Sequence, residues 1–201
     1  MSEHRPIVMA ITGASGAPYA VGVLESLVAA ERPVQLIVSS HGLRLLDTEM
    51  GIGSIAALRD RVGGTAFDSF VRVFDDADRG AAPASGSALN AGMVVVPCSM
   101  GTLSAIAAGS SRSLVERAAD VMLKERRPLI LVPRETPLSM IHLENMLRVT
   151  RAGAVVMPAA PGFYNRPAQI VDLVNFMVAR INDHLGVPHT LVKRWGSQEE
   201  S

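Results

Sequence analysis

The stretch IVMAITGASGA, residues 7–17, decides the fold of this chain. Five apolar residues in a row, followed by a threonine and a glycine, are typical of a strand that is buried on both faces and ends in a tight turn. After Gly16, apolar side chains recur at helical spacing, at Val21, Leu24 and Leu27. A buried strand that passes through a glycine turn into a helix begins a βαβ unit, so the stretch predicts a parallel sheet covered by helices.

The same alternation continues along the chain and predicts an α/β fold of three layers. Strands are predicted at 33–39, 70–74, 93–97, 129–132 and 154–157, and helices at 17–30, 41–49, 54–62, 114–124, 139–150 and 168–185, with one more after 102. With neither repeat nor linker, we expect one domain over 1–201 with a C-terminal tail from about 187. Ligands bind beyond the carboxyl ends of such strands, so the informative loops are 12–16, 39–42, 97–102, 133–139 and 158–165.

Composition and charge exclude several classes of protein. The 201 residues are 48% hydrophobic and include 19 basic and 19 acidic side chains, which leaves no sustained basic surface for nucleic acid or an anionic membrane. We expect no secretory signal and no membrane span. The lone cysteine, Cys98, precludes an internal disulfide, and the cytoplasm is the expected location. The apolar, aromatic-poor composition favours an oligomer.

Two of the predicted carboxyl-end loops suit a phosphorylated ligand. Thr12–Ala17 places glycines spaced G-x-x-G at a helix start, where free N–H groups and a partial positive charge favour a phosphate or the edge of a flavin. The dinucleotide pattern G-x-G-x-x-G is absent. Cys98–Thr102 offers two hydroxyls and a glycine at a second helix start. A plain turn in the first loop and a simple N-cap by Ser99 or Thr102 in the second are the alternatives.

Two further loops contain candidate polar or aromatic groups. Arg134 and Glu135 directly follow a buried strand, where an arginine beside a carboxylate suits phosphate binding or acid–base chemistry; the alternative is a surface salt bridge. Charged residues 125–127, ahead of that strand, are typical of a solvated turn. The stiff loop 158–164 ends in Tyr164, and tyrosines in such loops more often pack than catalyse. These patterns indicate a phosphorylated ligand but no particular reaction.

Eight short motifs together resemble the UbiX/Pad family of flavin prenyltransferases, formerly called aromatic-acid decarboxylases. The motifs are TGASGA at 12–17, PASGS at 83–87, PCSMGTLS at 97–104, ERAADVMLKERRPL at 116–129, VPRETPL at 132–138, HLENM at 142–146, PAAPGFY at 158–164 and RW at 194–195. Each alone is weak, but eight in this order and spacing over nearly the whole chain are highly specific.

The resemblance implies a Rossmann-like, flavodoxin-like fold with bound FMN and no metal. It implies that a dimethylallyl group passes from dimethylallyl monophosphate to N5 and then C6 of reduced FMN. The product, prenylated FMN, would serve a UbiD-type decarboxylase as its cofactor. Family members form large homo-oligomers with active sites at subunit junctions, so a dodecamer is expected.

The resemblance also assigns roles to individual residues. The expected FMN contacts are Gly13, Ala14, Ser15, Ser39, Ser99, Met100, Gly101, Thr102 and Arg134. The expected contacts to the prenyl phosphate are Lys124, Tyr164 and Arg180, with Arg117 suited to assist them and Trp195 closing the site from the tail. The expected catalytic residues are Ser15, Glu49, Lys124 and Glu135.

The chemistry of the expected reaction explains these residue types. Loss of phosphate from an allylic carbon develops charge on oxygen, which Lys, Arg and Tyr donors stabilise in a dry pocket. Glu135 matches a residue that manages protons at the leaving phosphate, and Glu49 matches one linked to the second bond to the flavin.

The chain departs from many relatives at one position, and two other functions compete. Ser40 stands where relatives often have a lysine, which removes any contact from that side chain. A flavin-dependent cysteine decarboxylase of the same fold would have PASANT at 83–88 and a PxMNxxMW segment, and this chain has neither. A non-catalytic flavin carrier would need no second phosphate site.

Overall fold

Six parallel strands form one sheet in the order β3-β2-β1-β4-β5-β6. The computed structural model describes residues 5–192, and its strands are β1 Ile7–Ile11, β2 Val34–Val38, β3 Val71–Phe74, β4 Gly92–Cys98, β5 Leu129–Pro133 and β6 Val155–Val156. This is the strand order of a Rossmann-type sheet. The predicted α/β class, with a parallel sheet, is confirmed.

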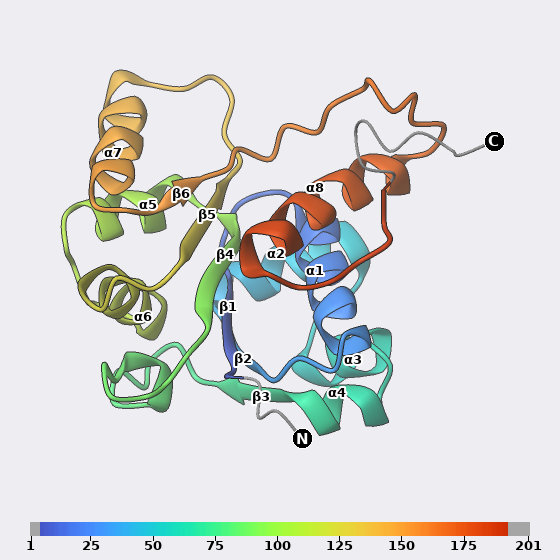
Figure 1. Cartoon of the computed structure of the whole chain (residues 1–201), viewed down its shortest axis with the longest axis horizontal. Helices are drawn as coiled ribbons and strands as arrows, with labels where there is room; N and C mark the ends of the chain where they lie inside the picture. Colours follow the sequence, from blue (N-terminus) through green and yellow to red (C-terminus); the bar gives the residue numbers. More distant parts are fainter. Residues whose placement is uncertain (1–4, 193–201) are drawn as a thin grey trace.

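Helices cover both faces of the sheet, which gives three layers (Figure 1). One face packs against α1 Ala17–Ala29, α2 Ser40–Met50, α3 Ile55–Arg61, α4 Thr65–Phe70 and α8 Ile170–Leu185. The other packs against the 3₁₀ turn η1 Ala82–Ala84, α5 Met100–Ala107, α6 Leu114–Lys124 and α7 Met140–Arg151. Among residues 5–192, no helix has the length and apolar character needed to cross a bilayer.

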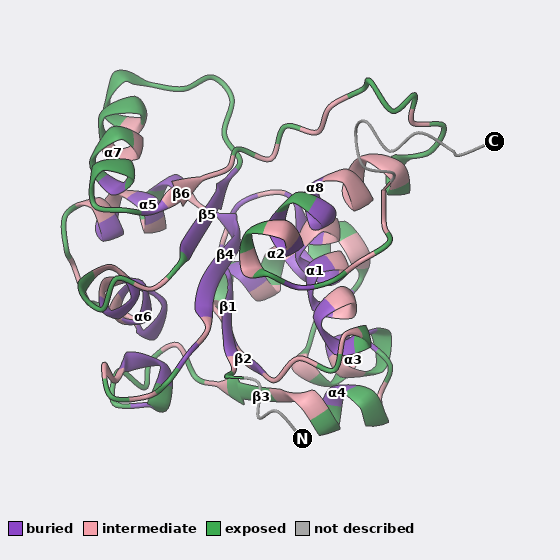
Figure 2. Cartoon of the chain, in the orientation of Figure 1, coloured by how far each residue is buried: buried purple, intermediate pink, exposed green. Residues whose placement is uncertain are grey.

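The first strand shows why this sequence builds a central strand. All five residues of β1 are at most 1% exposed, and the strands in the middle of the sheet are buried throughout (Figure 2). Met9 packs into the core on the α1 and α8 side, whereas Val8 and Ala10 pack into the core on the α5 and α6 side. Such a strand needs apolar residues on both faces, and residues 7–11 supply them.

The segment between β2 and β4 differs most from expectation. The helix α4, residues 65–70, was not predicted, because its six residues are too few to show a helical period and bury only Phe67. After β3 the chain crosses to the other face of the sheet and packs η1 against α6 before it enters β4. At the far edge β6 is only two residues long.

Candidate functional site

The carboxylate of Glu49 closes the N-terminus of α1. Glu49 Oε2 accepts hydrogen bonds from the N–H groups of Gly16, at 3.0 Å, and Ala17, at 2.8 Å. A negative charge at this end of a helix is favoured by the helix dipole. The motif predicted N–H groups open to a ligand, but α2 brings a side chain of the chain itself to them. Residues 13–15 precede these two N–H groups and form the remainder of the loop.

The loop after β1 lies directly against the start of α2. A Cβ added at Gly13 would lie 2.5 Å from Cβ of His41, so only glycine permits this approach. Ser39 begins α2 by accepting a hydrogen bond from the N–H of Gly42 at 3.1 Å. Ser40 is exposed. The structure therefore brings two of the expected FMN-contact segments, 13–15 and Ser39, into one place.

The N-terminus of α5 has the opposite character to that of α1. Ser99 caps it: its Oγ accepts a hydrogen bond from the N–H of Thr102 at 3.1 Å and lies 3.0 Å from the Thr102 hydroxyl. The first N–H groups of a helix have no partner within the helix. Within the described part of the chain, those of Met100 and Gly101 are left for a ligand. Ser99 therefore acts as an N-cap and still leaves a cradle for an anion.

These loops meet at the place where a sheet of this order binds its ligand. The loops after β1 and β4 flank the point where the strand order reverses, beyond the carboxyl ends of adjacent strands. Their donors are neutral N–H and hydroxyl groups at one open helix N-terminus, which suits a single phosphate. Arg134 follows β5, also at the carboxyl ends of the strands, and is exposed. The arrangement fits a mononucleotide such as FMN.

The residues expected at the prenyl phosphate are not gathered at that edge. Lys124 ends α6 on the side where β5 begins, and Glu135 follows the end of β5. The five residues of β5 lie between them and span about 16 Å at the usual rise of a strand. Lys124 pairs with Glu125, and Glu135 accepts a hydrogen bond from the N–H of Thr136. Within one chain, Lys124 therefore lies near the amino ends of the strands and Glu135 near their carboxyl ends.

The two expected arginines also pair with carboxylates close to them in the sequence. Arg117 Nη1 lies 2.7 Å from Asp120 Oδ2, and Arg180 Nη1 lies 3.0 Å from Asp183 Oδ2. Arg180 lines a hollow of about 380 Å³ between β6 and α8, together with Phe176. Tyr164 packs its ring against Phe176 in a T-shaped contact, with centroids 5.7 Å apart. The structure thus brings Tyr164 and Arg180 to one side of α8.

Comparisons with known proteins agree with this geometry. Residues 1–182 match the model of the Flavoprotein family. The flavin prenyltransferase UbiX of Pseudomonas aeruginosa is 48% identical, over 98% of this chain and 97% of its own length. AnUbiX (PadA1), crystallised with FMN and dimethylallyl pyrophosphate, is 41% identical with a TM-score of 0.89, over 98% of this chain and all of its own.

The chain belongs to the UbiX flavin prenyltransferase family. A second solved UbiX-like protein, a dodecameric FMN-dependent decarboxylase from Escherichia coli O157:H7, is 39% identical with a TM-score of 0.86. It covers 96% of this chain and all of its own length. The resemblance that the motifs predicted is confirmed. The role of each expected site residue stays a prediction, and Trp195 lies outside the described residues.

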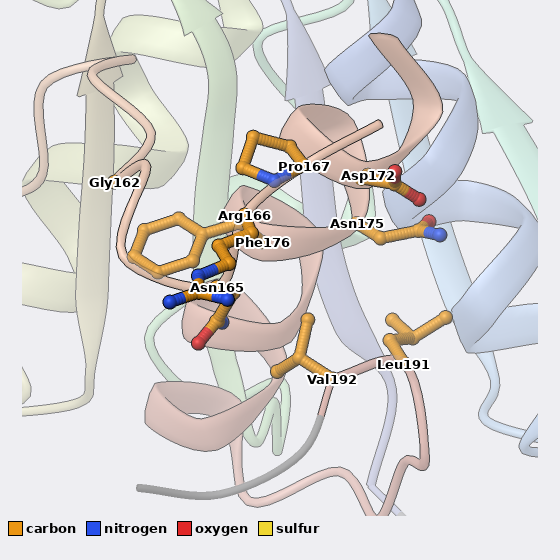
Figure 3. Close-up of a pocket in the computed structure, with 9 residues that line it drawn as sticks. All are labelled: Gly162, Asn165, Arg166, Pro167, Asp172, Asn175, Phe176, Leu191 and Val192. Atoms are coloured by element: carbon orange, nitrogen blue, oxygen red, sulfur yellow. The ribbon is translucent and has the colours of Figure 1, made fainter. Parts of the chain in front are cut away.

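Three features of this UbiX-family chain had no signal in the sequence. The hydroxyl of Thr12 binds the loop after β4. Arg127, expected in a solvated turn, is partly buried and donates to the carbonyl oxygens of Ala88 and Gly86 at 2.6 and 2.7 Å. A hollow of about 350 Å³ lies between α8, the 162–167 loop and residues 191–192. Figure 3 shows its lining, which is Gly162, Asn165, Arg166, Pro167, Asp172, Asn175, Phe176, Leu191 and Val192.

The cysteine beside the α5 loop has no role as a nucleophile in this state. Cys98 is fully buried, and burial raises the pKa of its thiol to about 12. The thiol is therefore protonated near neutral pH, and the reactive form of a cysteine is the thiolate. The side chains available for chemistry beyond the carboxyl ends of the strands are hydroxyl, carboxylate and cationic groups.

Proposed function

We propose that this protein transfers the dimethylallyl group of dimethylallyl monophosphate to N5 and then C6 of reduced FMN. The observation that carries the proposal is the pair of helix N-termini, of α1 and α5, that lie beyond the carboxyl ends of the strands in a chain of the UbiX family. One is closed by Glu49 and the other is open for a single phosphate. We further propose that residues 1–201 act as one FMN-binding domain.

In this proposal the open N-terminus of α5 holds the phosphate of FMN. The donors are the N–H groups of Met100 and Gly101 and the hydroxyls of Ser99 and Thr102. Residues 13–15 and Ser39 contact the flavin, and Arg134 adds a cation from the end of β5. Reduced FMN supplies the nitrogen and the carbon that accept the prenyl group.

Protein cations take the place of a metal at the prenyl phosphate. Lys124, Arg180 and Arg117 stabilise the negative charge that develops as the phosphate leaves, and Tyr164 donates a hydrogen bond to it. Glu135 exchanges protons with the leaving phosphate, and Glu49 assists the second bond-forming step. Cations and hydroxyl donors stabilise a leaving phosphate best in a site that excludes water. In one chain, however, the four residues Lys124, Glu135, Tyr164 and Arg180 are exposed, so another surface has to cover them.

We propose that a second copy of the chain covers these residues and completes the site. Lys124 and Glu135 lie at opposite ends of β5, so one chain does not bring both to one phosphate. If Lys124 of one copy faces Glu135 of another, both reach the same substrate. The dodecameric relative supports an assembly of this kind, and a dodecamer is the proposed state.

The helix α7 carries a surface suited to such an assembly. Met140, Leu143 and Leu147 follow each other along one side of α7 and are 71%, 47% and 49% exposed, and neighbouring Ile141 is 66% exposed. Contiguous apolar side chains of this kind mark interaction sites. Light scattering at micromolar protein tests the assembly: a single species near 21 kDa would contradict it.

The experiment that tests the reaction is the mass of the flavin. The holoprotein is reduced, incubated with dimethylallyl monophosphate and then denatured. The mass of the released flavin is measured by mass spectrometry. We expect a gain of one five-carbon prenyl unit, with no gain when the donor is left out. A flavin of unchanged mass would contradict the proposal and would favour an electron carrier. Dimethylallyl pyrophosphate in a parallel reaction measures the preference between donors.

The product suggests where the protein acts in a reaction sequence. Prenylated FMN is itself a cofactor, so we propose that a UbiD-type decarboxylase receives it. Adding the product of the reaction to a flavin-free UbiD-type enzyme tests this step, with decarboxylation as the readout.

A further inference from the structure

Thr12 connects the two loops that flank the middle of the sheet. Its hydroxyl donates a hydrogen bond to the carbonyl oxygen of Pro97 at 2.9 Å and accepts one from the N–H of Ser99 at 2.8 Å. Its backbone N–H also donates to the Pro97 carbonyl, at 3.2 Å. Thr12 is 2% exposed. One buried side chain therefore joins the end of β1 to the start of α5.

These bonds control the residue from which α5 begins. Ser99 has the extended backbone of an N-cap, with φ −71° and ψ 151°. Its hydroxyl is engaged by Thr102, and its N–H is held by Thr12. The peptide between Ser99 and Met100 carries the first free N–H of α5, so the orientation of Ser99 sets the direction of that donor.

We propose that Thr12 is a positioning residue for the phosphate of FMN. The inference rests on the proposed function, in which this phosphate binds at the N-terminus of α5. Thr12 acts through Ser99: it fixes the N-cap so that the N–H groups of Met100 and Gly101 converge on one point. Preorganised donors bind an anion more tightly than donors that must first be ordered.

The hydroxyl of Thr12, and not its bulk, carries this role. Valine has nearly the same shape but leaves the Ser99 N–H without its partner and removes one of the two hydrogen bonds that Thr12 donates to the Pro97 carbonyl. An unpaired buried N–H is costly, so the start of α5 would shift to find another partner. Serine keeps the hydroxyl and loses only a methyl group. The pair Thr12→Val and Thr12→Ser therefore separates hydrogen bonding from packing.

A phosphate-positioning role predicts a selective loss of affinity. Riboflavin has the ring and the ribityl chain of FMN but no phosphate. If Thr12 orders the phosphate cradle, its hydroxyl contributes to FMN binding and hardly to riboflavin binding. A residue that only holds the protein together would affect both ligands alike.

The experiment compares the two flavins in four proteins. The full-length wild type, Thr12→Val, Thr12→Ser and Thr150→Val are titrated with FMN and with riboflavin, with quenching of flavin fluorescence as the signal. For Thr12→Val we expect the Kd for FMN to rise about tenfold, as for one well-placed hydrogen-bonded group. Its Kd for riboflavin should stay within about twofold. Thr12→Ser should behave as the wild type.

Thr150→Val is the matched control. The Thr150 hydroxyl also donates to a backbone carbonyl, that of Met146 at 2.8 Å, but it lies on α7, far along the chain from the loops concerned. Its removal should change neither Kd. Should Thr12→Val fail to fold, Thr12→Ala gives the same comparison with a smaller side chain.

Two outcomes would overturn the inference and leave FMN binding in place. One is an unchanged Kd for FMN in the hydroxyl-free variant, and the other is an equal loss for FMN and riboflavin. A wild type that binds FMN no better than riboflavin would instead refute the proposed phosphate site, and the role of Thr12 with it.

Discussion

The two halves of the expected site are built in different ways. At the flavin loops, residues far apart in the sequence bond to one another: Ser99 to Thr12, 87 positions away, and Gly16 to Glu49, 33 positions away. Among the described cations expected at the prenyl phosphate, the partners are near neighbours. Lys124 pairs with the next residue, and Arg117 and Arg180 pair with residues three positions on.

This difference separates what one chain preorganises from what it does not. Long-range bonds hold the flavin loops in place before any ligand arrives. Partly or fully exposed pairs between near neighbours contribute little, so they do not fix a cation in a catalytic position. We infer that one chain suffices for the flavin half, whereas the prenyl-phosphate half takes its final geometry between subunits.

The largest expected effect comes from removing the cation of Lys124. In Lys124→Ala, prenyl transfer should fall by about 10²–10³, as when a preorganised donor to developing charge is lost. The Kd for FMN should not change, because the proposed FMN site lies beyond the carboxyl ends of the strands and Lys124 lies near their amino ends. Single-turnover formation of prenylated flavin measures the rate, and Arg79→Ala, an exposed cation elsewhere, is the control. A wild-type rate would show that Lys124 belongs to a surface pair.

Mixing two impaired variants tests whether the halves come from different copies. Glu135→Gln keeps the shape of the side chain but loses its charge, so it should also slow transfer while FMN stays bound. The two variants are then co-expressed in equal amounts. Half of the copies supply an intact Lys124 and half an intact Glu135, so about a quarter of the sites should contain both residues and be active. The rate of each variant alone is the reference. No recovery in mixed oligomers would mean that each site takes both residues from one chain.

A smaller effect is expected at the cap of α5. Ser99→Ala removes the cap of the helix and one hydroxyl of the phosphate cradle, so the Kd for FMN should rise about fivefold, the size of an N-cap loss near 1 kcal/mol. With FMN at saturation, the rate of transfer should recover, because the prenyl-phosphate half is untouched. Flavin titration and a rate measured at high FMN give the two numbers. An equal loss of rate at saturating FMN would contradict the separation of the halves.

The smallest effect concerns the anchoring of α6, which carries Arg117 and Lys124. Burial disfavours the charge of Glu116, but the hydrogen bonds from Arg112 outweigh it and hold the pKa of Glu116 below its usual 4.5. A carboxyl group with a lowered pKa stabilises the folded protein at neutral pH and loses that contribution as the pH falls through its folded pKa.

Glu116→Gln should therefore lower the Tm at pH 7 by about 2–4 °C, as for a loss near 1 kcal/mol. The difference from the wild type should shrink as the pH falls below the usual pKa of a glutamate, about 4.5, and through the lower folded pKa of Glu116. Calorimetry at pH 7 and at a series of lower pH values measures both, and the Kd for FMN at pH 7 should not change. A constant difference in Tm across this range would rule out the charge of Glu116 as the cause.

Much of this molecule could be predicted from local sequence. The strand at residues 7–11 and its glycine turn were expected because an unbroken apolar run has only one stable place in such a fold, the middle of a parallel sheet. The Ser99 cap was expected as well. The helix at 65–70 was not, because its single buried residue leaves no periodic signal.

The sequence by itself determined the α/β class and the resemblance to a family, and it predicted the loops for a ligand, because each depends on local patterns and their order. Only the tertiary structure decided which groups meet. Thr12 and Ser99 are distant in the sequence but hydrogen-bonded to each other. Lys124 and Glu135 are close in the sequence but lie at opposite ends of β5. The reason is physical: a local pattern sets the period of each element, but neighbours across a sheet depend on strand order, which the packing of all the elements determines.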